Sequence, residues 1–308
     1  MTDATVRDPK QARSIRGVLP VFQTPFHIND TIDFTTLEQE IHWLYDQGAN
    51  GIVMGMVSET LRLSSEEREQ LAAAACRFGR ERGVVIISAG AESTRLAVRY
   101  AQQAEAVGAD AVMVIPPISV AVGEEELKHY YEQIIQAITI PVVVQDASGY
   151  VGRPMSIAMQ AALFNEYGDR VLFKPEATPI GPRLSALRDA TAGRAPVFEG
   201  SGGIALVDSY RRGIVGTMPG ADLIDAIVAL WQALQAGDDQ RIYQLSLPIS
   251  ALIAVQNSLD AFLAVEKYLL VKRGIFQNTL MRGPVGYRLD DETRQEVDRL
   301  FAQLQAAL

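Results

Sequence analysis

The chain has 308 residues, of which 48% are hydrophobic and 21% charged, so it can build the core of one large domain or two small ones. The formal net charge is −9 and no basic cluster stands out, which argues against nucleic acid or an anionic membrane as a partner. A single cysteine, Cys76, excludes an intramolecular disulfide, and no run approaches the ~20 apolar residues of a membrane span. The first sixteen residues lack the apolar core of a signal peptide. We therefore expect a cytoplasmic protein.

Short apolar runs alternate with segments of helical periodicity along the chain, after a polar N-terminal arm at residues 1–16. The runs that predict strands are residues 17–22, 51–55, 84–90, 111–115, 141–145, 171–173, 196–199 and 213–217. The segments that predict helices are residues 33–47, a stretch that opens at Ser64 with capping-box spacing, and residues 94–107, 123–137, 155–167, 182–192, 203–212 and 221–235.

This eightfold alternation predicts an α/β fold, a (β/α)8 TIM barrel. The strands lack strict polar and apolar alternation, which is typical of parallel strands buried on both faces. Helix-length crossovers are also what parallel pairing requires. An open doubly wound sheet is the alternative, but no Gly-x-Gly-x-x-Gly turn follows the first strand.

The last part of the chain predicts a C-terminal extension of three helices, at residues 238–255, 259–273 and 291–307. Their apolar faces must pack on the barrel flank or on a neighbouring subunit. We expect an arm at residues 1–16, a barrel at 17–236 and a helical extension at 237–308.

Lys174 is the candidate nucleophile. The active sites of (β/α)8 barrels lie at the carboxyl ends of the strands, and Lys174 is the one lysine that follows a predicted strand there. An ammonium group in apolar surroundings is poorly solvated and tends to lose its proton, and a neutral lysine amine forms Schiff bases with carbonyl substrates. The alternative is a solvated lysine just beyond a strand end.

Other chemistries find less support in the sequence. The three histidines, His27, His42 and His129, are scattered, so no metal site and no cofactor is predicted. Ser58 lacks the Gly-x-Ser-x-Gly setting of a hydrolase nucleophile. Glycines near residues 200–203 and 216–220 would suit a phosphate, but tight turns and close approach of a substrate explain them better.

Four segments, in this order, carry a family resemblance. They are Gly55-x-x-x-Glu59 followed by Glu66-Glu67-Arg68, Ala104-x-x-x-Gly108 with the run that ends in Pro116-Pro117, Pro141-Val142-Val143-Val144, and Phe173-Lys174. Together they resemble the dihydrodipicolinate synthase/N-acetylneuraminate lyase superfamily of class I aldolases. The resemblance implies a (β/α)8 barrel, usually a tetramer, that binds pyruvate or another 2-oxo acid, with Lys174 as the Schiff-base lysine.

The resemblance and the positions at the strand ends indicate which residues bind the substrate. The loop after the second strand, here Met56, Val57, Ser58 and Glu59, matches the loop that holds the substrate carboxylate. Gln145 and Asp146 stand in the turn after the fifth strand, and Gly200, Ser201 and Gly202 follow the seventh.

The chain departs from the synthases of this family in its proton-handling residues. Gln145 stands where they have a catalytic tyrosine, Met56 and Val57 replace two threonines, and Ile118 replaces a further tyrosine. An amide transfers no proton at neutral pH, so another general acid or base is needed. Tyr150 and Glu176 are the candidates, with a bound water as a third.

The turns resemble most those of relatives that act on 2-keto-3-deoxy sugar acids, such as 2-keto-3-deoxyarabonate-type dehydratases. We therefore expect a Schiff-base-forming lyase for a small-molecule 2-oxo acid, a dehydratase or aldolase of a 2-keto-3-deoxy sugar acid, which works as a homo-oligomer. Three alternatives stay open: dihydrodipicolinate synthase itself, a non-catalytic barrel that binds a keto acid, and a phosphosugar enzyme.

Overall fold

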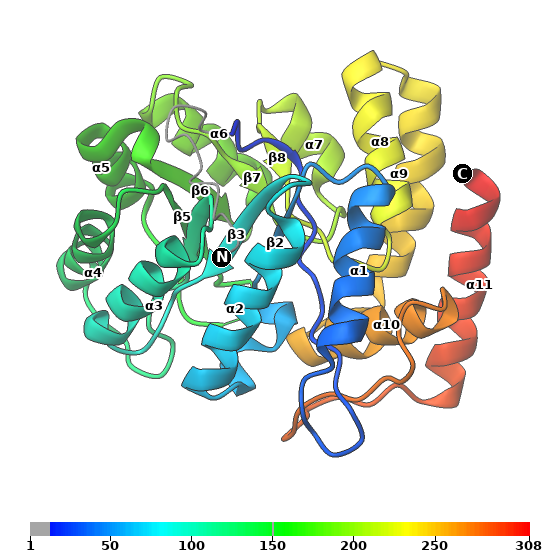
Figure 1. Ribbon diagram of the computed structural model, residues 1–308. Helices are drawn as coiled ribbons and strands as arrows, with labels where there is room; N and C mark the ends of the chain where they lie inside the picture. Colours follow the sequence, from blue (N-terminus) through cyan, green and yellow to red (C-terminus); the bar gives the residue numbers. More distant parts are fainter. Residues whose placement is uncertain (1–12, 150) are drawn as a thin grey trace.

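The computed structural model describes residues 13–149 and 151–308, and within them it forms a barrel of eight parallel strands (Figure 1). Residues 1–12 of the predicted arm and Tyr150 lie outside the described residues. The strands are β1 (Gly17–Val18), β2 (Gly51–Val53), β3 (Val84–Ser88), β4 (Ala111–Val114), β5 (Val142–Asp146), β6 (Val171–Pro175), β7 (Phe198–Glu199) and β8 (Gly216–Thr217). These elements confirm the predicted fold.

The barrel closes through short bridges between two hydrogen-bonded sheets. One sheet has the order β1-β8-β7 and the other β2-β3-β4-β5-β6. Val21 bridges to Val53 and to Gly220, and Phe173 bridges to Val197, all in parallel. The first strand is shorter than the predicted residues 17–22 because Pro20 has no N–H to donate to a ladder.

One helix follows each strand. These helices are α1 (Phe34–Asp46), α2 (Ser65–Gly79), α3 (Thr94–Ala106), α4 (Glu124–Ala137), α5 (Ile157–Tyr167), α6 (Ile180–Ala190), α7 (Leu206–Arg211) and α8 (Ile224–Ala236). Helix α7 is shorter than the predicted residues 203–212. Gly202 and Gly203 have φ values of +71° and +107°, in the left-handed region, so the helix begins only after them.

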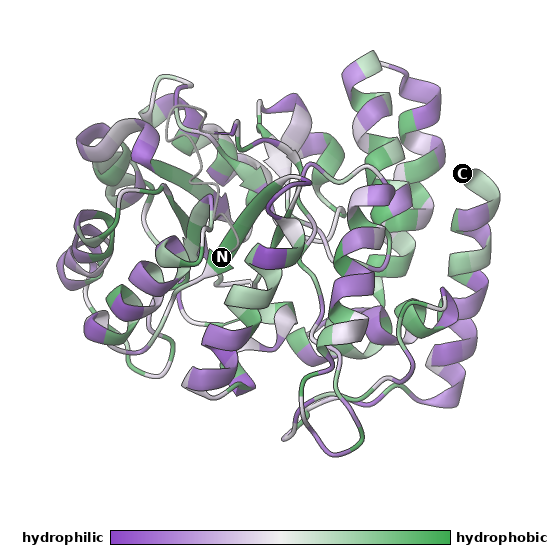
Figure 2. Cartoon of the chain, viewed as in Figure 1, coloured by the Kyte–Doolittle hydropathy of each residue, from purple (hydrophilic) through white to green (hydrophobic). Residues whose placement is uncertain are grey.

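Two apolar layers hold the barrel together. Side chains such as Val143, Leu172 and Phe198 fill its interior, whereas Val142, Val144 and Phe173 pack outward against the helices. Figure 2 shows the apolar strands inside and the polar outer faces of the helices. Successive residues of each strand therefore point alternately inward and outward.

Three further helices follow the barrel, α9 (Asp239–Ala254), α10 (Leu259–Lys272) and α11 (Asp291–Ala307). Helix α9 packs between α8 and α11, while α10 contacts the loop after β2 (Figure 1). Helix α10 thus reaches the carboxyl ends of the strands. In the described part of the chain no single helix is long and apolar enough to cross a membrane. Helices α9 and α10 taken together have the length and composition of a membrane span, but they are bent by 120° relative to each other.

Candidate active site

A pocket opens at the carboxyl ends of the strands. Its apolar walls include Val21, Met113 and Met218 from the barrel and Leu259 and Phe262 from α10. Among the described residues, the charged and amide side chains that line it are Gln145, Lys174, Glu176 and Glu266. The pocket therefore offers a few polar groups in largely apolar surroundings, which is the usual character of a small-molecule site.

Strand alternation places the first two of these polar residues in the pocket. Leu172 points into the barrel, so Lys174, two residues later on β6, points the same way. Val143 and Gln145 repeat this relation on β5, and Gln145 is the register partner of Lys174. Neighbouring parallel strands thus bring the amide beside the amine on the inner face.

Lys174, Glu176 and Gln145 form a buried polar cluster. The Lys174 Nζ lies 2.8 Å from Glu176 Oε1, and Gln145 Nε2 donates to Glu176 Oε2 at 2.6 Å. The three residues are 2% to 4% exposed. Gln145 Oε1 is buried and has no hydrogen-bond partner among the described residues, so it is left as an acceptor for a ligand.

Burial changes the proton affinity of the carboxyl group in this cluster. Desolvation raises the pKa of Glu176 above its ordinary value, although Lys174 and the Gln145 amide act in the opposite direction. A carboxyl group with a raised pKa, in contact with a lysine, can exchange a proton with that lysine and with a bound molecule.

Gly200 makes room for the cluster at the end of β7. A Cβ at this position would lie 2.6 Å from Lys174 Cε and 2.8 Å from Glu176 Oε1. Both distances are well inside van der Waals contact. The glycine is therefore required by the close approach of these two side chains, and it lines the pocket together with Gly202. The close approach of a substrate, which the sequence predicted here, stays a prediction.

The loop after β2 divides into pocket residues and structural residues. Met56 and Val57, in the 3₁₀ turn η1 (Met56–Ser58), line the pocket. The Ser58 hydroxyl instead accepts from the Gly55 N–H at 3.1 Å and donates to the Phe22 carbonyl at 2.5 Å. Glu59 pairs with Lys267, away from the pocket lining.

Two other predicted site residues also have structural partners. Asp146 follows Gln145 on β5 and so points away from the barrel interior, where it accepts from the Ser148 and Met155 N–H groups. Ser201 donates through its backbone and its hydroxyl to Glu199. Neither belongs to the pocket lining. Binding roles for Asp146, Ser201, Ser58 and Glu59 stay predictions.

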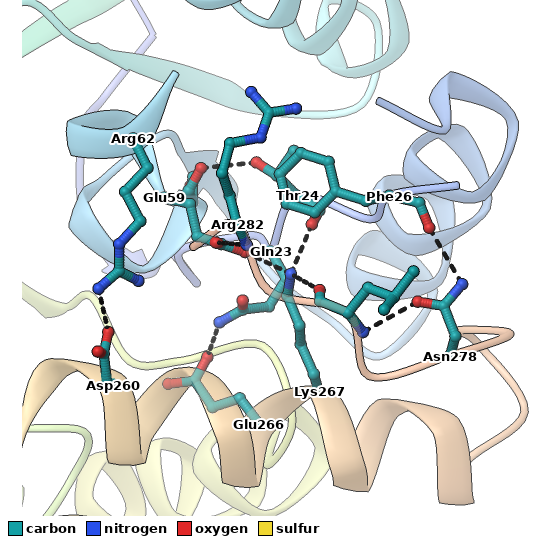
Figure 3. Close-up of polar contacts among 12 residues, drawn as sticks. Gln23, Thr24, Phe26, Glu59, Arg62, Asp260, Glu266, Lys267, Asn278 and Arg282 are labelled. Carbon is teal, nitrogen blue, oxygen red and sulfur yellow. Dashed lines mark hydrogen bonds and ion pairs between the residues drawn. The ribbon is translucent and has the colours of Figure 1, made fainter. Parts of the chain in front are cut away.

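Sequence reasoning missed the contribution of α10 to this site (Figure 3). Lys267 is fully buried and donates to Glu59, to the Thr24 carbonyl at 2.9 Å and to the Leu280 carbonyl at 2.6 Å. These three acceptors use all donors of an ammonium group, so Lys267 is a structural cation that holds α10 across the barrel mouth. The signal was two adjacent charges, Glu266 and Lys267, in the middle of a helix whose other charged residues, Asp260 and Lys272, lie in its end turns.

The site does not suit a metal ion or a phosphate. Among the described residues, no group of three or more His, Cys, Asp and Glu side chains could hold a metal. The glycines after β7 and β8 face carboxyl groups, because a Cβ on Gly220 would lie 2.5 Å from Glu266 Oε1 and one on Gly200 would meet Glu176. The carboxyl groups of Glu176 and Glu266 thus occupy the space beside these glycines that a phosphate would need.

The sequence and the structure of this chain are similar to those of known lyases. Residues 14–304 match the Dihydrodipicolinate synthetase family. The chain is 27% identical to the 4-hydroxy-tetrahydrodipicolinate synthase of Bartonella quintana (strain Toulouse), over 92% of this chain and 96% of the relative. It is also 27% identical to the L-2-keto-3-deoxyarabonate dehydratase of Azospirillum brasilense, over 92% of each. The crystal structure of dihydrodipicolinate synthase from Rhodopseudomonas palustris matches with a TM-score of 0.84 at 27% identity, over 94% of this chain and 97% of that one.

Proposed function

The chain belongs to the dihydrodipicolinate synthetase family of class I aldolase-type lyases, and from this membership and the pocket geometry we propose that it is a Schiff-base-forming lyase for a 2-oxo acid. The substrate we propose is a 2-keto-3-deoxy sugar acid, which the enzyme dehydrates or cleaves. One observation carries the proposal: the buried contact between Lys174 and Glu176 at the carboxyl end of β6.

The first stage of the proposed reaction uses this pair alone. Glu176 accepts a proton from the Lys174 ammonium group, and the neutral amine attacks C2 of the 2-oxo acid. Glu176 then returns the proton to the oxygen of the carbinolamine. Water leaves, and a protonated imine joins C2 to Nζ, with Glu176 again ionised.

The second stage needs one group that removes a proton and returns it. The Glu176 carboxylate takes a proton from C3, which converts the iminium to an enamine. It then gives that proton to the hydroxyl on C4, so the C4–O bond breaks, a C3–C4 double bond forms and water departs. Dehydration therefore requires only the titratable groups that line the pocket near Lys174.

Gln145 supports a sugar-acid lyase over the synthase. It stands where the resemblance places the synthases' catalytic tyrosine, and its amide can orient Glu176 but cannot relay a proton. Because the two relatives are equally distant at 27% identity, overall similarity does not discriminate between them. We therefore base the choice of a sugar-acid lyase on the chemistry of Gln145, the residue beside the lysine.

Borohydride reduction in the presence of pyruvate or a 3-deoxy-2-oxo sugar acid, followed by mass mapping, tests the proposal. We expect a reduced adduct on Lys174, none in Lys174→Ala, and an unchanged adduct in the control Lys128→Ala, which alters a half-buried lysine of α4 outside the pocket lining. Absence of an adduct on Lys174 with every 2-oxo acid would refute the proposal.

Product analysis then separates the reactions. Loss of water from a sugar acid indicates the dehydratase, release of pyruvate indicates the aldolase, and formation of 4-hydroxy-tetrahydrodipicolinate indicates the synthase. Trapping without turnover over a panel of sugar acids would instead indicate a keto-acid-binding barrel. The homotetramer and the cytoplasmic location stay predictions.

A further inference from the structure

We propose that Glu266 of α10 is a second substrate-binding residue, which acts as an uncharged carboxylic acid and donates a hydrogen bond to a hydroxyl on the substrate tail. The inference rests on the proposed function and deepens it, because it identifies a residue that selects the substrate by its tail.

Glu266 lies in the same pocket as Lys174 but against other strands. It lines the pocket together with Leu259 and Phe262, which precede it on one face of α10. Its carboxyl group receives a hydrogen bond from the Gln23 side chain, after β1 (Figure 3). Lys174 lies on β6, beside β5, so the two groups lie on different sides of the pocket.

The surroundings of Glu266 are built to admit its carboxyl group. A Cβ on Gly220 would lie 2.5 Å from Glu266 Oε1 and 2.9 Å from Oε2. Gly220 thus has the same relation to Glu266 as Gly200 has to Lys174. Gly200, after β7, leaves room for Lys174, and Gly220, after the neighbouring strand β8, leaves room for Glu266.

The charge environment favours the protonated form of Glu266. It is 2% exposed, and no ion pair to it occurs within the described residues. Asp222 and Glu40, both acidic, act electrostatically on Glu266, while Lys267 forms its ion pair with Glu59. Burial, with the acidic neighbours, raises the pKa of Glu266 well above its ordinary value.

A neutral carboxyl group differs from a carboxylate in what it recognises. It has one O–H to donate and a carbonyl oxygen to accept, which complements a hydroxyl group. An ionised Glu266 would instead favour an ammonium group. A 2-oxo acid anchored at Lys174 therefore binds best if its far end carries hydroxyls and no positive charge.

The test is a competition between two ligands for Lys174. Pyruvate has no tail, whereas a 3-deoxy-2-oxo sugar acid has one, and borohydride reduction records both as adducts of different mass. We expect Glu266→Leu to lower the ratio of the sugar-acid adduct to the pyruvate adduct about 10- to 100-fold, as for a lost polar contact to substrate. Glu266→Gln, which keeps an uncharged hydrogen-bond donor, should stay within about threefold of the wild-type ratio.

Pyruvate trapping separates a binding role from a structural one. It should remain at the wild-type rate in both variants, since the tail contact is absent. Gly220→Ala displaces the Glu266 carboxyl group without changing its chemistry. This variant should lower the ratio of the sugar-acid adduct to the pyruvate adduct as well, and it replaces Glu266→Leu if that variant does not fold.

An unchanged adduct ratio in Glu266→Leu or Gly220→Ala, or a glutamine variant as impaired as the leucine variant, would overturn the inference. An equal loss of both adducts would do the same, because it indicates a structural role. If no 2-oxo acid traps on Lys174 in the wild-type protein, the proposed function fails and this inference with it.

Discussion

Replacing Gly200 with alanine should misplace the proposed nucleophile without unfolding the barrel. The added methyl would lie 2.6 Å from Lys174 Cε and 2.9 Å from Nζ. Carbon atoms in favourable contact are about 3.5 Å apart, so Cε must move by about 1 Å. Gly200 is absent from the glycines with positive φ, so alanine adds no backbone strain.

The expected result follows from that displacement. A shift of about 1 Å at a reacting atom can lower the rate about 100-fold, which corresponds to about 2.7 kcal/mol in the activation free energy. The assay is the rate at which pyruvate and borohydride modify Lys174, followed by mass spectrometry. Thermal unfolding of the variant should stay close to that of the wild-type protein.

Gly123→Ala provides the matched control. Gly123 precedes α4, has a φ of −71°, and has no atom within 4 Å of an added Cβ. We expect wild-type trapping in this variant. Wild-type trapping in Gly200→Ala as well would refute the argument that the space at Gly200 fixes the position of Lys174.

Three more predictions concern buried charges. The Gln145 amide donates a hydrogen bond that lowers the pKa of Glu176, so Gln145→Leu should raise that pKa. The acidic limb of the kcat–pH profile, where Glu176 becomes ionised, should then move to higher pH. An acidic limb that does not move would contradict this prediction. Lys267→Met leaves Glu59 buried without its cation, and we expect urea unfolding to show a loss of about 3 to 5 kcal/mol, partly recovered when Glu59→Gln is added. A loss below about 1 kcal/mol would rule out a stabilising clamp. Burial raises the pKa of Glu40 from 4.5 to about 8. Between these two pH values the folded chain holds a proton that the unfolded chain releases, so the free energy of unfolding decreases as the pH rises from 4.5 to about 8. Glu40→Gln should flatten the decline in urea midpoint across that window, and an unchanged slope would contradict the assignment.

The sequence by itself determined the barrel and the place of its lysine. Eight apolar runs that alternate with helical segments predict a (β/α)8 barrel. The end of each apolar run marks the carboxyl end of a strand, where the active site of such a barrel lies. The two-residue period of a strand then places Lys174 and Gln145 on the inner face and Asp146 on the outer one. Strand geometry alone sets the direction of these side chains, so the order and spacing of the residues in the sequence are enough to predict it.

Only the tertiary structure decided which residues accompany the lysine. Ser58 and Glu59 stand in the loop predicted to bind the substrate, yet their polar atoms bond to Phe22 and to Lys267. Glu266 lies far along the chain, on a helix predicted only to pack, and it enters the pocket because Lys267 anchors α10 across the barrel mouth. Such contacts depend on how a distant helix docks, and no periodicity within the helix encodes its docking partner.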